Sequence, residues 1–189
     1  MQCGKLRRYA KKQERHGPTY RRINYMNSKG KLILFCGKMG AGKTTLSKSI
    51  SAKKKSVFIS EDEWLSSHYA EQINSFEDYL SYSQKIKPFI KEHIQSILCA
   101  GITVVLDFPA NTLNQRQWLV SLSNEIGSEH ELIYLNVTDD VCLAQISNRR
   151  KEQPERAQFD TPEVFREVTF HFQAPSESEG LNIVERKNA

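Results

Sequence analysis

The residues best suited to chemistry lie in one short segment, Gly37 to Thr44, which has the spacing G-x-x-x-x-G-K-T. Its glycines can adopt backbone conformations that turn N–H groups inward around a phosphate. Lys43 can reach the outer phosphates of a nucleoside triphosphate, and the Thr44 hydroxyl is a suitable oxygen ligand for Mg²⁺. The segment therefore predicts a phosphate loop. The residues expected to contact the nucleotide are Gly37, Lys38, Met39, Gly40, Ala41, Gly42, Lys43, Thr44 and Thr45.

The surroundings of this segment support the same interpretation. An apolar run, residues 32–36, precedes it, and a polar run with helical propensity extends from Lys43 to about Lys53. Strand, glycine-rich loop and helix in this order are the context that the motif requires. The helix would add its unpaired N–H groups and the positive end of its dipole to the loop. The alternative is a glycine-rich surface turn beside a buried strand.

Three acidic residues follow a second apolar run, residues 57–59. They are Glu61, Asp62 and Glu63. In an open α/β sheet the ligand lies beyond the carboxyl ends of the strands, so this cluster is expected to contain a catalytic carboxylate. The alternative is structural, with Ser60 capping a helix whose first turn favours negative charge. Both interpretations can hold together.

Asp107 ends the most strand-like run of the chain, residues 102–106. A buried parallel strand that finishes in Asp is typical of the Mg²⁺-directed carboxylate of phosphate-transferring enzymes. The alternative is that Asp107 caps a helix or a loop. Together with Thr44, it is our candidate metal ligand.

Two arginines, Arg149 and Arg150, end a helix that is expected to begin at about residue 139. Arginines at a mobile edge can clamp phosphate in the transition state through charge-assisted bonds. A solvated helix end is the alternative. Arg116 lies on the first turns of another expected helix, residues 112–126, where it can face either the site or solvent.

Apolar runs of strand type alternate with helical patterns along the chain. The expected strands are 32–36, 57–59, 102–106, 132–137 and 181–184. The longest helical pattern spans 76–100, with Pro88 expected to kink or split it, and a last helix opens at Thr161-Pro162. Such alternation predicts a parallel, doubly wound sheet with right-handed crossovers. The fold class is therefore α/β: a P-loop NTPase with three αβα layers, a five-stranded parallel sheet and a small arginine-bearing lid.

Charge is distributed unevenly over the 189 residues. Residues 1–29 hold nine Lys and Arg against one acid, whereas the remainder carries a net charge of −3. We expect 1–29 to be a basic, flexible arm and 30–189 to be one ATP-binding domain. Alternatives for the arm are binding to nucleic acid or another polyanion, a natural start at Met26, and an organelle-targeting peptide.

Composition describes an ordinary soluble protein, with 39% hydrophobic and 26% charged residues. No apolar run approaches the ~18 residues of a membrane span, so we expect a cytoplasmic protein without a membrane partner. The four cysteines are scattered without a C-x-x-C pair, which favours buried thiols over a zinc site or disulfides.

Residues 30–186 resemble the small P-loop kinases of the polynucleotide kinase, zeta-toxin and chloramphenicol phosphotransferase group, whose uncharacterised members are described as AAA-type ATP-binding proteins. The resemblance rests on motifs that follow one another in the right order. They are the Walker A loop at 37–44, Ser60-Glu61-Asp62, Asp107 with Asn111 and Arg116, Arg149-Arg150, and an ending with Pro175, Glu179-Gly180 and Val184. Between Asp107 and Asn111 the chain has one residue more than the usual spacing. Only the Walker A loop is specific alone.

The resemblance implies ATP-dependent phosphorylation of a hydroxyl, with Mg²⁺ as cofactor. Asp62 would be the general base, with Glu61 and Glu63 as fallbacks. The other roles implied are charge neutralisation by Lys43, Arg149 and Arg150, and metal binding by Thr44 and Asp107. The acceptor stays open: the acidic body favours a small molecule, which is the preferred expectation, whereas the basic arm favours a nucleic acid end.

A second class of function also fits the phosphate loop. An ATP-binding or ATP-hydrolysing switch would use the same loop without a phosphoryl acceptor. A GTPase is disfavoured, because the sequence contains no N-K-x-D motif for reading guanine.

Overall fold

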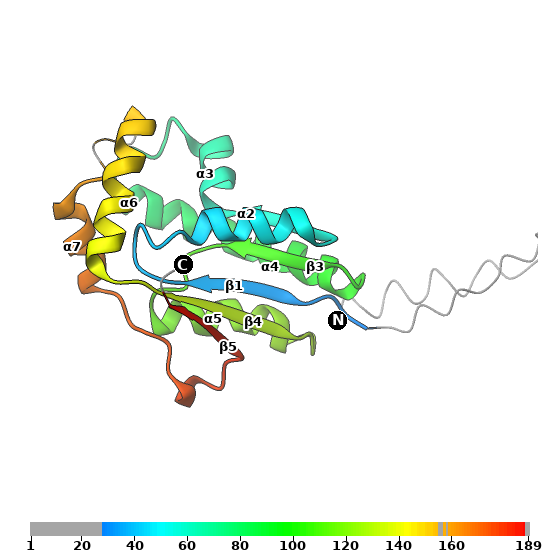
Figure 1. The fold of residues 1–189 in the computed structure, drawn as a ribbon. Helices are drawn as coiled ribbons and strands as arrows, with labels where there is room; N and C mark the ends of the chain where they lie inside the picture. The colour runs from blue at the N-terminus through cyan, green and yellow to red at the C-terminus, as the bar shows by residue number, and fades with distance from the viewer. Residues whose placement is uncertain (1–27, 155–156, 158, 188–189) are drawn as a thin grey trace, which may run out of the picture.

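The computed structural model describes residues 28–187 apart from residues 155, 156 and 158. Nearly all of the basic arm expected at 1–29, and Met26 with it, therefore lies outside the described residues. The described chain forms one five-stranded sheet in the order β2-β3-β1-β4-β5, and all of its pairings are parallel (Figure 1). The strands are β1 (Leu32–Cys36), β2 (Ser56–Ser60), β3 (Thr103–Asp107), β4 (His130–Asn136) and β5 (Ile183–Lys187).

The central strand β1 is buried along its whole length. Its apolar sequence LILFC has no alternation of polar residues, as expected of a strand that helices cover on both faces. In the register, Leu32 lies beside Val104 of β3 and beside His130 of β4. At the other end Ser60 lies beside Asp107, so β2 and β3 finish level with each other.

Helices cover both faces of the sheet and make three layers, which confirms the predicted fold class. On one face α2 (Lys43–Lys53) packs through Leu46 and Ile50 onto apolar side chains of β1, β3 and β4. On the other face lie α4 (Phe76–Cys99) and α5 (Leu113–Asn124). Their buried side chains share one core cluster with the opposite face of the strands.

Three further helices lie toward the carboxyl end of the sheet: α3 (Glu61–Tyr69), α6 (Asp139–Glu152) and α7 (Pro162–Phe170). Figure 1 shows α6 and α7 at the end to which the arrowheads of the strands point. The Ser60 hydroxyl caps α3, and Thr161 caps α7 with Pro162 at its first position. A short 3-10 turn, η2 (Glu177–Glu179), precedes β5.

Pro88 does not split the longest helix, because α4 continues through it from Phe76 to Cys99. Pro88 is exposed, so the carbonyl that loses its N–H partner can face water. The helix is held instead by its buried side chains Ile90, Ile94 and Leu98. Of the two predicted effects of Pro88, a kink or a split, the split was therefore wrong.

The other differences are small. The last strand starts at Ile183, two residues later than expected. On α6 the apolar residue Val141 is exposed, whereas its neighbour Cys142 is buried.

The structure also bears on the cysteines and on membrane spans. Cys36, Cys99 and Cys142 are free thiols, of which Cys36 and Cys142 are buried, and Cys3 lies outside the described residues. Within the described part of the chain, no helix is both long enough and apolar enough to cross a bilayer.

Candidate active site

The phosphate loop, residues 37–44, connects β1 to α2 at the carboxyl end of the sheet. Gly40 and Gly42 have left-handed backbone conformations, with φ of 77° and 90°. A Cβ at Gly40 would come within 2.6 Å of the Cys142 carbonyl oxygen and 2.8 Å of Ile146 Cγ1. The loop therefore needs glycine both for its turn and for the close approach of α6. No side chain caps the start of α2, which leaves its first N–H groups for an anion.

Lys43, the first residue of α2, is folded back into this loop. Its ammonium group donates hydrogen bonds to the carbonyl oxygens of Gly37 and, at 2.9 Å, of Lys38. Burial lowers the pKa of Lys43 to about 8, against the opposing influence of nearby acidic groups that include Asp107. The side chain therefore places a positive charge inside the predicted phosphate loop at neutral pH.

Asp107, at the end of β3, lies beside this lysine. Burial raises the pKa of Asp107, and the negative charge of Asp62 adds to that rise. A hydrogen bond with the Thr44 hydroxyl and the charge of Lys43 act in the opposite direction. Thr44 and Asp107 thus offer two adjacent oxygen ligands of the kind that Mg²⁺ prefers, and the residues present fit that ion.

The acids that follow β2 have different surroundings, beginning with Glu61. Its side chain is only 3% exposed, and its two oxygens accept hydrogen bonds from the hydroxyls of Ser83 (2.6 Å) and Tyr79 (2.7 Å). Burial raises the pKa of Glu61, and these two hydrogen bonds oppose the rise. The Tyr79 hydroxyl also lies 3.1 Å from Asp62 Oδ1. Asp62 itself is exposed, so only one of the two neighbouring carboxylates is open to a ligand.

Glu63, the third acid of the cluster, is exposed and forms a salt bridge of 3.0 Å with Lys48 of α2. Its backbone N–H donates to the Ser60 hydroxyl, so the helix-cap interpretation of this region is confirmed. Tyr79 and Ser83 were missed by the sequence analysis. Their spacing of four residues on α4, opposite a run of acids, was the only available signal.

Arg149 and Arg150, the two arginines expected on the lid, lie on α6 and have different surroundings. Arg149, on the last turn of α6, binds both carboxylate oxygens of Asp160, which is fully buried. Its positive charge is among the influences that lower the pKa of Lys43, so Arg149 is within electrostatic reach of the phosphate loop. Arg150 is exposed. The two arginines, which are adjacent in sequence, therefore point to different surroundings.

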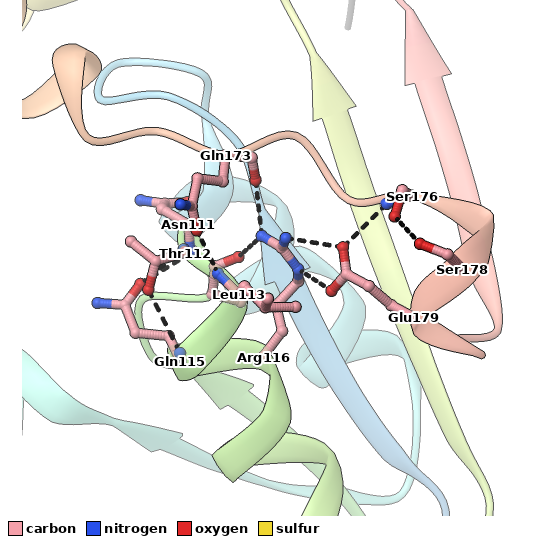
Figure 2. Close-up of polar contacts among 10 residues, drawn as sticks. Asn111, Thr112, Leu113, Gln115, Arg116, Gln173, Ser176, Ser178 and Glu179 are labelled. Carbon is pink, nitrogen blue, oxygen red and sulfur yellow. Dashed lines mark hydrogen bonds and ion pairs between the residues drawn. The ribbon is translucent and has the colours of Figure 1, made fainter.

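Arg116 faces neither the site nor solvent, in contrast to both sequence-based alternatives, because its side chain is only 1% exposed. Its Nε and Nη2 atoms donate to the two Glu179 oxygens at 2.7 and 2.8 Å. Nη1 donates to the carbonyl oxygens of Ala110 (3.2 Å) and Gln173 (2.7 Å). Figure 2 shows the guanidinium between these groups. Arg116 therefore joins three segments of the chain below the site.

Asn111 lies between Arg116 and the phosphate loop. Its side-chain oxygen accepts a hydrogen bond of 3.2 Å from the Gly37 N–H, and its backbone oxygen accepts one of 2.9 Å from the Gln173 N–H. The amide therefore contacts the loop directly, despite the extra residue between Asp107 and Asn111.

Comparison with known proteins places this arrangement in a wider context. The AAA domain family matches residues 32–175, which is most of the chain. No protein of curated function has a significant sequence match to it.

Several solved structures share the fold. One is the APS kinase CysC of Mycobacterium tuberculosis in complex with AMPPNP and APS, with a TM-score of 0.61, 14% identity and coverage of 85% of this chain and 90% of that one. A candidate kinase from Chloroflexus aurantiacus has a TM-score of 0.66 and 16% identity, with 86% of each chain covered. An unliganded sugar kinase from Janibacter sp. has a TM-score of 0.56 and 14% identity, with 84% and 85% covered.

Proposed function

Because this chain belongs to the AAA domain family, we propose that its phosphate loop serves an ATP-dependent phosphotransferase. The reaction moves the γ-phosphate of ATP to a hydroxyl group of a small-molecule or nucleotide-type acceptor. The observation that carries this proposal is the position of Asp62, an exposed carboxylate whose charge acts on Asp107 beside Lys43. A carboxylate that is open to solvent at this edge of the sheet can receive a proton from an acceptor. The fold shared with proteins described as kinases supports the same class.

The donor half of the site is formed by the phosphate loop. Its inward N–H groups and Lys43 bind the phosphates of ATP, because they combine positive charge with unpaired donors. Thr44 and Asp107 would hold Mg²⁺, which when bound supplies further positive charge next to the transferring phosphoryl group. Arg149 and Arg150 of the lid neutralise the charge that remains.

The acceptor half is formed by the end of β2. Asp62 accepts the proton of the acceptor hydroxyl while that oxygen attacks the γ-phosphorus, and the bond between the γ-phosphorus and the bridging oxygen breaks. Glu61 is a poor candidate for this role, since both of its oxygens are already bonded and its side chain is buried. Glu63 is open but bound to Lys48, so it stays the fallback base.

The proposal is tested by incubating the protein with γ-labelled ATP and Mg²⁺, in the presence of pooled small molecules or oligonucleotides. Label should appear in a component of one pool. Asp62→Asn should reduce transfer by roughly 10²- to 10⁴-fold, the usual contribution of a general base, and leave ATP affinity nearly unchanged. Lys43→Ala provides the inactive reference and Glu63→Gln the matched carboxylate control.

Two outcomes would contradict this assignment. Loss of ATP binding in Asp62→Asn would give that residue a metal-binding or structural role. Hydrolysis that no pool changes would favour the ATP switch without an acceptor.

A further inference from the structure

The first two residues of the phosphate loop are each tied to one end of the lid, which here means the two helices α6 and α7. Lys38 forms an ion pair with Asp139, the first residue of α6. The Gly37 N–H donates to Asn111, whose backbone oxygen accepts from the N–H of Gln173, three residues beyond the end of α7. The entry to the lid thus contacts one loop residue directly, and the exit is joined to the preceding loop residue through Asn111.

The exit is held by more than one bond. Besides its contact with Asn111, Gln173 accepts hydrogen bonds from the Leu113 N–H on its side-chain oxygen (2.7 Å) and from Arg116 on its backbone oxygen (2.7 Å). Arg116 is itself locked by Glu179 (Figure 2). Gln173 is thus held by hydrogen bonds to Asn111, Leu113 and Arg116, at and just before the start of α5. Of these three residues, Asn111 is the one that contacts the phosphate loop.

The same two loop residues are the partners of Lys43. Its ammonium group donates to the carbonyl oxygens of both Gly37 and Lys38. An ammonium group has three donors and these two carbonyl oxygens use two of them, so a phosphate that takes more than the remaining donor must displace at least one of the two bonds. The two carbonyl oxygens that hold Lys43 therefore belong to the same two residues that contact Asn111 and Asp139.

We propose that Asn111 is a positioning residue that couples the phosphate loop to the lid exit, so that occupancy of the loop is transmitted to α7 and, through Asp160 just before it, to Arg149 of α6. The coupling runs from Gly37 through Asn111 to Gln173. This inference rests on the proposed function, because a lid with a phosphate-neutralising arginine matters only for a phosphate-transferring site. Its test, however, does not depend on turnover.

The test measures amide hydrogen exchange of α7 in the full chain, with and without saturating Mg²⁺ and AMPPNP. In the wild-type protein the nucleotide should slow exchange in α7. In Asn111→Ala the Gly37 N–H loses its acceptor, so α7 should exchange about threefold to tenfold faster without nucleotide, and most of the nucleotide-dependent change should disappear. Asn111→Asp keeps an acceptor oxygen and should restore the slow exchange of the nucleotide-free protein.

Asn114→Ala is the matched control, since Asn114 is an exposed residue of α5 close to Asn111 in sequence. Amide exchange of α7 in this variant should equal that of the wild type. Gln173→Ala, at an exposed position, removes only the hydrogen bond from the Leu113 N–H. It should also accelerate amide exchange in α7, but by a smaller factor than Asn111→Ala. Exchange in β1 reports the core and should stay unchanged in all of these variants.

Three results would overturn the coupling. The first is α7 exchange in Asn111→Ala and Gln173→Ala that equals the wild type. The second is a faster exchange in Asn111→Ala that nucleotide still slows by the same factor as in the wild type, which would mean a merely structural role for Asn111. The third is a wild-type protein that binds AMPPNP without any change in α7. A protein that shows the coupling but transfers no phosphate would contradict the proposed function alone.

Discussion

At the scale of single residues, the charge of Lys43 is the property most sensitive to its surroundings. Its ammonium group has left water for a backbone pocket in which two carbonyl oxygens replace part of its hydration. Burial favours the neutral form of an amine, which is the reason for a pKa of about 8. The binding of phosphate favours the charged form again.

This leads to a prediction about pH. Because the folded-state pKa of Lys43 is lowered to about 8, the free protein loses the lysine charge as pH rises through that value. The affinity for ATP should be nearly constant from pH 7 to 8 and should then fall by up to about tenfold per pH unit. Titration calorimetry between pH 7 and 9.5 measures this change.

Lys43→Arg is the control for this prediction, since a guanidinium keeps its charge over the whole range. Its affinity for ATP, although altered in absolute value, should show no break near pH 8. A wild-type affinity that stays flat to pH 9.5 would show that Lys43 keeps its proton in the free protein.

Local sequence signals were sufficient to predict the phosphate loop, but not to predict which of the acids after β2 is buried. Strand, glycines, lysine and helix follow one another within a few residues, so Gly37 to Thr44 could be identified directly. That Glu61 is buried while its neighbour Asp62 is open could not, because the difference depends on Tyr79 of α4. Which face of α3 meets α4 is decided by tertiary packing and leaves no trace in the spacing of the acids.

At the scale of elements, α6 is the helix that brings an arginine toward the phosphate loop. Its packing is close, since Cys142 and Ile146 lie against the backbone of Gly40. Arg149 is oriented at the far end of the same helix by the buried Asp160, which holds the guanidinium in two parallel bonds. A side chain fixed in this manner has little rotamer entropy left to lose when it meets a phosphate.

A comparison of single arginine variants tests this role of α6. We expect Arg149→Ala to lower kcat by roughly 10²-fold with a smaller change in the KM for ATP, because its charge matters most in the transition state. Asp160→Asn should cause a partial loss of kcat, since one of the oxygens that orients Arg149 is replaced. Steady-state kinetics of the phosphotransfer reaction provide both values.

The helix offers its own comparison residues. Arg150→Ala should have a smaller effect on kcat than Arg149→Ala, and Lys151→Ala, at the exposed end of α6, should have none. Equal kinetics for Arg149→Ala and Lys151→Ala would return Arg149 to the role of a structural partner of Asp160.

The elements themselves could largely be predicted, and the exceptions have physical causes. α2 and α7 begin where the sequence indicated, because their start signals are the residues in the first turn. Pro88 is a break signal of the same local kind, but the apolar face of α4 outweighs it at an exposed position. Tertiary packing overrides local propensity when one side of a helix is strongly buried.

At the scale of the whole molecule, the pair Arg116–Glu179 connects the two halves of the described chain. Arg116 lies at the start of α5 and Glu179 in the turn before the edge strand β5, 63 residues later. Nothing in the sequence near Arg116 indicates that a remote segment covers it, and an arginine on the first turns of a polar helix is usually solvated. The sequence analysis therefore could not assign its burial.

Removing the carboxylate charge should destabilise the entire domain. In Glu179→Gln the buried guanidinium loses its counter-charge, for which a cost of about 3 kcal/mol in the free energy of unfolding is expected. Urea unfolding at pH 7 measures this value. Glu177→Gln, an exposed position in the same turn, should stay within about 0.5 kcal/mol of the wild type.

The pH dependence of stability gives an independent check on the same pair. The hydrogen bond from Arg116 lowers the pKa of Glu179 in the folded state, so its contribution is present above the ordinary carboxyl pKa and is lost as pH falls through the lowered value. The difference in the free energy of unfolding between wild type and Glu179→Gln should therefore become smaller as pH falls below the ordinary carboxyl pKa. A difference that stays constant down to pH 3 would show that the charge of Glu179 does not provide the stabilisation.

The long separation between Arg116 and Glu179 also has a consequence for synthesis on the ribosome. At 5–20 residues per second, roughly 3 to 13 s pass between the addition of these two residues. Until Glu179 is present, full packing of α5 onto the sheet is disfavoured, because it would bury a guanidinium without its counter-charge. We therefore expect a polypeptide that ends before residue 179 to keep that face of α5 hydrated, which links the packing of α5 to the synthesis of a segment 63 residues later.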